Sequence, residues 1–120
     1  MGVMMQTFYW DCPREDGKEF QWWNYIHREI PGLAKAGFTS LWLPPVHKAA
    51  NLFGPSMGYD PYDYYDLGEF DQKGTVPTWF GTRKELESLI ESAHRHGLSL
   101  IADIVINHNG NRIEQAIKSI

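Results

Sequence analysis

Residues 98–106, LSLIADIVI, form a nearly continuous apolar run that contains one charged side chain, Asp103. Such a run is typical of a parallel strand covered on both faces, and it predicts a buried strand. Parallel strands cannot be joined by a tight hairpin and need a crossover connection, usually a helix. This run therefore constrains the chain to an α/β fold more strongly than any other segment.

Two shorter apolar runs precede this strand. Residues 3–10 carry bulky apolar and aromatic side chains and stop at the turn sequence DCP, and residues 38–43 stop at Pro44 and Pro45. Proline has no N–H group to donate to a strand ladder, so each run is expected to end there. Both runs are predicted strands.

Two segments between these runs have helical spacing. Residues 22–34 carry the first apolar stripe and end near Gly37, although Pro31 is expected to break or kink the helix. Residues 82–85, TRKE, form a capping box before a second stripe that ends near Gly97. The order strand, helix, strand, helix, strand predicts right-handed βαβ units on a parallel sheet, within a single domain of residues 1–120.

A long connection, residues 44–80, joins the second strand to the second helix and shows no helical or strand period. Connections of this length in a compact domain are usually functional or disordered. It contains GYDPYDYYDLG at residues 58–68, which mixes flat aromatic rings with carboxylates, the parts of which sugar sites are made. By chemistry alone the tract could equally be a turn-rich loop packed on its own tyrosines.

Charge and cysteine content exclude several classes of function. The formal net charge of −4 is spread along the chain without a run of Lys or Arg, so neither nucleic acid nor a membrane surface is an expected partner. Cys12 is the single cysteine and cannot form an internal disulfide. With no export signal at the N-terminus, the sequence predicts a cytoplasmic protein, or a secreted one whose signal has been removed.

Polar residues gather where the third strand ends, at the edge where parallel α/β sheets bind ligands. Strand alternation places Asp103, Val105 and Asn107 on one face. A carboxylate in so apolar a strand needs a partner, and a structural ion pair to an arginine is at least as good an explanation of Asp103 as direct catalysis. Asn107 offers an amide oxygen suited to Ca²⁺ and His108 a donor suited to a sugar hydroxyl, but both could be ordinary loop residues.

Four motifs, taken in order, resemble the α-amylases of glycoside hydrolase family 13. They are LPP at 43–45, GYDPYDYYDLGEF at 58–70, QKGTV at 72–76 and DIVINH at 103–108. The resemblance runs from the first predicted strand to His108. It implies that the chain is the βαβαβ portion of a TIM (β/α)₈ barrel, with residues 44–80 as a loop on the substrate side. The spacing of apolar residues in the tail adds a predicted short C-terminal helix.

The resemblance also implies roles for individual residues. Tyr59 matches the ring that stacks on the sugar at the cleavage point, and His108 matches the histidine that binds its hydroxyls. Asp60 lies in the same motif as Tyr59 and is taken as a third substrate-binding residue. Asp103 is implied to be a structural residue of the active site that pairs with the catalytic arginine, and Asn107 a calcium ligand.

Retaining hydrolysis of α-1,4-glucans, the activity of this family, needs three carboxyl residues that follow the fourth, fifth and seventh strands. The 120 residues stop before all three, so no catalytic residue is assigned and the chain alone is expected to be inactive. The divergent tail, residues 109–120, replaces the family's long inserted domain, so the implied calcium site is incomplete. The alternatives are a non-catalytic module that binds α-glucans or maltooligosaccharides, and a barrel fragment that oligomerises.

A homo-oligomer is expected because three strands leave sheet edges unpaired. In the tail, Ile113, Ile117 and Ile120 have the spacing of a short amphipathic helix that needs cover.

Overall fold

The computed structural model describes residues 2–8, 20–50 and 59–105. Three short parallel strands form the main sheet in the order β1-β2-β5: β1 (Met4–Gln6), β2 (Ser40–Trp42) and β5 (Ser99–Ile101). The register is continuous, because Leu41 of β2 lies between Met5 and Leu100. The predicted α/β class with parallel βαβ units is confirmed.

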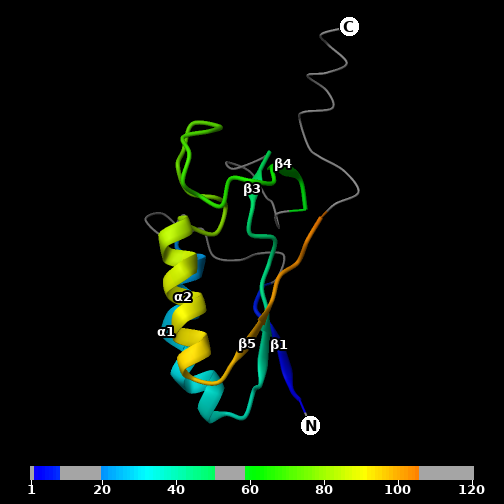
Figure 1. Ribbon diagram of the computed structural model, residues 1–120, viewed down its shortest axis with the longest axis vertical. Helices are drawn as coiled ribbons and strands as arrows, with labels where there is room; N and C mark the ends of the chain where they lie inside the picture. Colours follow the sequence, from blue (N-terminus) through cyan, green and yellow to red (C-terminus); the bar gives the residue numbers. More distant parts are fainter. Residues whose placement is uncertain (1, 9–19, 51–58, 106–120) are drawn as a thin grey trace, which may run out of the picture.

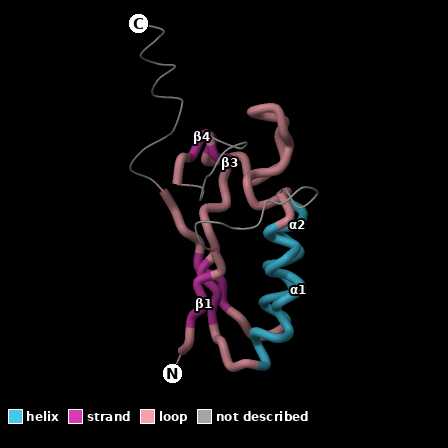
Figure 2. Tube along the Cα trace, turned by 180° about the vertical axis from the view of Figure 1, so that it is seen from behind, coloured by secondary structure: helices cyan, strands magenta, loops and turns pink. Residues whose placement is uncertain are grey.

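Two helices cross over between the strands and lie side by side on the same face of the sheet (Figures 1 and 2). Helix α1 (Trp22–Lys35) connects β1 with β2, and α2 (Arg83–Arg95) precedes β5. A break of the helix at Pro31 is ruled out, since α1 continues through it to Lys35. Pro31 lies on the exposed side of α1, where water can satisfy the carbonyl group that lacks its N–H donor.

Both helices end in the same motif. Gly37 and Gly97 have positive φ angles of 100° and 75°, which glycine adopts without steric cost. The N–H group of the next residue then bonds back to the last turn: Phe38 N to Leu33 O at 3.2 Å and Leu98 N to Ala93 O at 2.9 Å. Each strand therefore starts from a fixed helix end.

Helix α2 begins as predicted. The Thr82 hydroxyl accepts from the backbone N–H of Glu85 at 3.2 Å, and the Glu85 carboxylate accepts from the backbone N–H of Thr82 at 2.8 Å. This reciprocal pair satisfies two N–H groups that have no partner within the helix.

The hydrophobic core lies between the helix pair and the sheet. Trp23 and Ile30 of α1, Leu41 of β2 and Leu89 of α2 are fully buried. Trp79 and Phe80 close the core from the end of the long loop. Part of the aromatic content is therefore core, while Tyr59, Tyr65 and Phe70 remain exposed.

The predicted burial of the third strand is wrong for β5. Ile101 is 44% exposed and Ile104 is 60% exposed, whereas Leu98 and Val105 are buried. The reason is that β5 is an edge strand in the described sheet and α2 packs on one of its faces. An apolar run shows that a strand can be buried, but not that other elements pack on both of its faces. Half of this run is not covered by other elements among the described residues.

The long loop contains a second, two-stranded sheet that the sequence did not predict. Strands β3 (Lys48–Ala49) and β4 (Pro61–Asp63) pair antiparallel beyond the carboxyl ends of the main sheet (Figure 1). The predicted C-terminal helix falls in residues 106–120, outside the described residues. No helix in the described ranges is long and apolar enough to cross a membrane.

Candidate functional site

Side chains that follow the three parallel strands meet one side chain from the long loop. Phe8 follows β1, Trp42 ends β2, Asp103 follows β5, and Tyr59 lies just before β4. We call these four residues the Tyr59 cluster. It occupies the carboxyl ends of the strands, the edge at which parallel α/β sheets bind ligands.

Asp103 is the polar centre of the Tyr59 cluster. Its Oδ2 accepts a hydrogen bond from Trp42 Nε1 at 3.2 Å and a short one from the Tyr59 hydroxyl. Phe8 packs edge-on against Trp42, with ring centroids 5.4 Å apart, and lies 6.4 Å from Tyr59. Two strands and the loop are thus tied to a single carboxylate.

The Tyr59 ring is held in place but is not enclosed. Phe8 is 5% exposed, whereas Tyr59 is 40% exposed. Partial burial, the hydrogen bond to Asp103 and the negative charge of Asp103 together raise the pKa of the Tyr59 phenol to about 12. At neutral pH the hydroxyl is therefore protonated and donates to Asp103.

Asp103 needs a partner, as the sequence indicated, and within the described ranges two groups donate to it, an indole and a phenol. The arginine implied by the family resemblance is not among them and stays a prediction.

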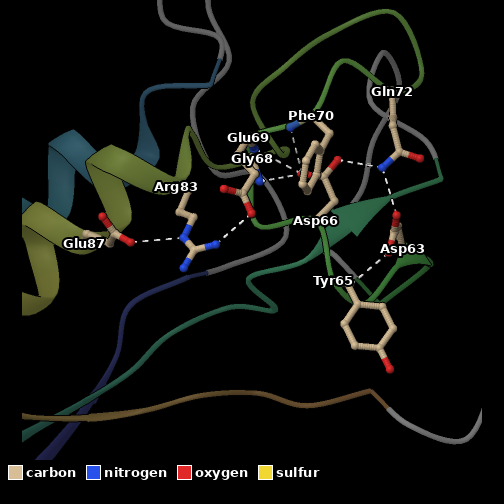
Figure 3. A network of polar contacts seen from close by, with 9 residues as sticks. All are labelled: Asp63, Tyr65, Asp66, Gly68, Glu69, Phe70, Gln72, Arg83 and Glu87. Atoms are coloured by element: carbon tan, nitrogen blue, oxygen red, sulfur yellow. Dashed lines mark hydrogen bonds and ion pairs between the residues drawn. The ribbon is translucent and has the colours of Figure 1, made fainter.

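The tract that carries Tyr59 is organised by a buried carboxylate, Asp66. Its Oδ1 accepts from the backbone N–H groups of Gly68, Glu69 and Phe70 at 2.9, 3.1 and 3.4 Å. Its Oδ2 accepts from Gln72 Nε2 at 2.9 Å, and the same amide donates to Asp63 at 2.9 Å (Figure 3). These bonds offset the cost of burying the charge.

The far end of the tract is joined to α2. The guanidinium group of Arg83 forms ion pairs with Glu69 at 2.7 Å and Glu87 at 3.0 Å. The backbone N–H of Arg83 donates to Gly68 O at 3.2 Å. A Cβ atom at Gly68 would lie 2.6 Å from the carbonyl oxygen of Gly81, so only glycine fits this contact. The tract is therefore attached to the rest of the fold at both of its ends.

The other predicted site residues are placed only in part. Asp60 is half-buried beside Tyr59, and its carbonyl oxygen accepts from Ala50 N at 2.7 Å. Asn107 and His108 lie outside the described residues. In the ranges that the structure describes, no group of three or more His, Cys, Asp or Glu side chains could hold a metal ion.

The burial of three ionisable residues of the described loop was missed by sequence reasoning: Asp66, Lys48 and His47. Asp66 had a sequence signal, since an Asp two residues before a Gly favours a turn in which the side chain caps the backbone. Lys48 and His47 had none, because their burial depends on contacts made by distant parts of the chain.

Comparison with known proteins identifies the family. Residues 14–120 match the profile described as "Alpha amylase, catalytic domain". The chain belongs to this family. Its fold is the βαβαβ portion of the (β/α)₈ barrel of these enzymes.

Curated relatives include enzymes that act on α-glucans. The chain is 44% identical to the α-amylase of Bacillus licheniformis over 109 residues, which are 91% of this chain and 20% of that protein. It is 40% identical to the cytoplasmic α-amylase of Escherichia coli over 88% of the chain and 20% of that protein. The chain thus spans about one fifth of the length of these relatives.

Solved structures agree on the fold. An alternansucrase in complex with isomaltotriose superposes with a TM-score of 0.70 at 27% identity, over 91% of this chain and 10% of that one. A trehalose-6-phosphate hydrolase from Bacillus licheniformis gives a TM-score of 0.67 at 24% identity, over 92% and 18%.

Proposed function

We propose that this chain supplies part of the α-glucan-binding site of an α-amylase-type glycoside hydrolase, with Tyr59 as the surface on which a glucose ring stacks. The observation that carries the proposal is the half-exposed Tyr59 ring, fixed through its hydroxyl to Asp103 at the carboxyl ends of the strands. The relatives named above as α-amylases support α-1,4-glucans such as starch and maltooligosaccharides as the ligand class.

The geometry suits stacking more than hydrogen bonding for Tyr59. The phenol hydroxyl already donates its proton to Asp103, and 40% of Tyr59 is exposed at the carboxyl ends of the strands. A ring whose orientation is fixed before binding loses less conformational entropy when the ligand arrives. Asp60 and His108 are proposed to bind sugar hydroxyls, and Asp103 to hold Tyr59 in place.

Retaining hydrolysis requires two carboxyl groups about 5 Å apart on either side of the glycosidic bond. Asp60 and Asp103 lie in motifs that match the family, but in neither of these roles, so this chain is proposed to bind and orient the glucan without cleaving it. Asn107 is proposed to offer an amide oxygen to calcium. Its fit stays a prediction, because it lies outside the described residues.

A titration with two matched oligosaccharides tests the ligand class. Maltohexaose and cellohexaose differ only in the α or β configuration of their linkages, and Trp42 in the Tyr59 cluster reports binding by fluorescence. The proposal expects weak, saturable binding of maltohexaose and none of cellohexaose. Equal binding of both sugars, or of neither, would overturn it.

A role as an oligomerising fragment is the second candidate, favoured by apolar residues at both edges of the sheet. Met4 is 50% exposed on β1 and Ile101 is 44% exposed on β5. Exposed edge strands of this kind pair readily with a second chain. Sedimentation at tens of micromolar tests this proposal, with a dimer or larger species expected and a folded monomer contradicting it.

A further inference from the structure

Lys48 is fully buried in the described loop, with an exposed fraction of 0%, as is Asp66. Its Nζ donates to the carbonyl oxygens of Thr75, Val76 and Pro77 at 2.6, 3.2 and 2.8 Å, and lies 3.2 Å from Thr75 Oγ1. We call these four oxygens the Lys48 cage. A cage of acceptors around three N–H donors matches an ammonium group.

No carboxylate forms an ion pair with Lys48 within the described residues. The backbone N–H of Lys48 donates to the carbonyl oxygen of Asp66 at 2.8 Å, while the Asp66 carboxylate is occupied by its own turn. Burial lowers the pKa of Lys48, and the negative charges of Asp66 and Asp71 oppose this shift. The ammonium group thus depends on the backbone of residues 75–77 for most of its solvation.

The Lys48 cage is connected to Tyr59 through the backbone pairing of β3 with β4. Lys48 is the first residue of β3 and pairs with Asp63 of β4. Two residues later, the backbone N–H of Ala50 donates to the carbonyl oxygen of Asp60 at 2.7 Å. Asp60 is the neighbour of Tyr59, so the position of β3 determines where the Tyr59 backbone lies.

We propose that Lys48 is a positioning residue of the Tyr59 cluster: by locking β3 to residues 75–77, its ammonium group sets the place from which Tyr59 reaches Asp103. The effect on glucan binding rests on the function proposed above, but the effect on the Tyr59–Asp103 hydrogen bond does not. The competing explanation is that Lys48 only contributes to folding, in which case a folded variant keeps the hydrogen bond.

The test compares Lys48→Met, which keeps the length of the side chain and removes the charge, with Lys84→Met, an exposed control on α2. Carbon-13 NMR of labelled tyrosine rings at about pH 7, where Lys48 is charged, reports the Tyr59–Asp103 hydrogen bond through the chemical shift of the ring carbon that bears the hydroxyl. Tyr59→Phe assigns the Tyr59 signal, and Asp103→Asn shows its position without the carboxylate. We expect the parent signal in Lys84→Met and a signal displaced toward that of Asp103→Asn in Lys48→Met. A folded Lys48→Met that keeps the parent Tyr59 signal would overturn the proposal.

Chemical rescue keeps the test decisive if Lys48→Met does not fold. Lys48→Ala retains Cβ, and added propylammonium replaces the missing part of the side chain. Propylammonium is expected to restore the fold and the parent Tyr59 signal, whereas tetramethylammonium, which has the charge but no N–H donors, is not. Restoration by both ions or by neither would contradict the proposal.

Glucan binding separates this proposal from the proposed function. If Lys48→Met displaces the Tyr59 signal while Tyr59→Ala leaves maltohexaose affinity unchanged, the positioning role stands and the glucan site is wrong. If Tyr59→Ala weakens binding while Lys48→Met keeps the parent Tyr59 signal, the glucan site stands and the positioning role is wrong.

Discussion

The hydroxyl group of Tyr59 donates to the carboxylate of Asp103, 44 residues further along the chain. Tyr59 precedes β4 of the loop sheet, and Asp103 follows β5 of the main sheet. This hydrogen bond therefore sets the loop on the carboxyl ends of the strands. It also engages the hydroxyl proton of Tyr59, which supports the proposal that a sugar contacts the ring instead of this proton.

Asp103→Asn should lower the pKa of the Tyr59 phenol from about 12 toward its ordinary value of about 10, but only in part, because burial is the largest cause of the shift. A raised pKa in the folded state contributes stability that is complete below about pH 10 and is lost as the pH rises toward about 12. Tyrosine NMR and urea unfolding across this range measure both effects. An unchanged Tyr59 titration in Asp103→Asn would show that the hydrogen bond has no such role.

Asp66→Asn should destabilise the fold by about 2 kcal/mol or more, since hydrogen bonds to a charged group contribute about 1.5–3 kcal/mol. The amide group also brings an NH₂ where the Gln72 side chain already donates. Urea unfolding gives the free energy, with the exposed Glu91→Gln on α2 as a control expected within about 0.5 kcal/mol of the parent. Equal stability of the two variants would refute the importance of the Asp66 turn.

The burial of His47 predicts that the stability of the fold decreases at acidic pH. Its side chain is buried, Nε2 has no hydrogen-bond partner among the described residues, and the ring packs edge-on against Tyr64. Burial lowers the pKa of His47, and the charge of Asp63 opposes this. The unfolded chain then binds a proton below about pH 6.5 that the folded chain resists, so stability falls as the pH drops below that value.

His47→Phe keeps a ring against Tyr64 and removes the titrating group. The loss of unfolding free energy between about pH 7.5 and 5.5 should therefore be smaller in this variant than in the parent. His94→Phe, at an exposed position on α2, is the matched control. The interpretation fails if His47→Phe and the parent lose the same free energy over this range.

The purified chain should release no measurable reducing sugar from starch at any pH, because its residues match none of the family's catalytic carboxylates. Release that survives repurification and disappears in Asp103→Asn or Asp60→Asn would contradict this. It would mean that association of chains had assembled a new carboxylate pair.

The sequence predicted those parts of the fold that depend on local rules. The capping box at Thr82, the helix ends at Gly37 and Gly97 and the order of strands and helices all follow from neighbouring residues. The helix does not break at Pro31, because the packing of the whole apolar face of α1 outweighs the loss of one N–H donor.

The loop could not be predicted in the same way. Strands of two and three residues have no recognisable period, and their pairing depends on the burial of Lys48 and Asp66 by distant segments. For the site, the sequence indicated that Asp103 needs a partner but not that Tyr59 and Trp42 supply it, since these lie 44 and 61 residues away. The role of Tyr59 came from family resemblance alone.

The most direct test of the glucan site is a maltohexaose titration of Tyr59→Ala and Tyr65→Ala, followed by NMR. Both changes remove a tyrosine ring from the same loop, but Tyr65 is 87% exposed and its ring is not part of the Tyr59 cluster. Loss of an aromatic contact of about 1 kcal/mol should weaken binding about fivefold in Tyr59→Ala, with no change in Tyr65→Ala. Unchanged affinity in Tyr59→Ala, or an equal loss in both variants, would contradict the placement of the α-glucan site at Tyr59.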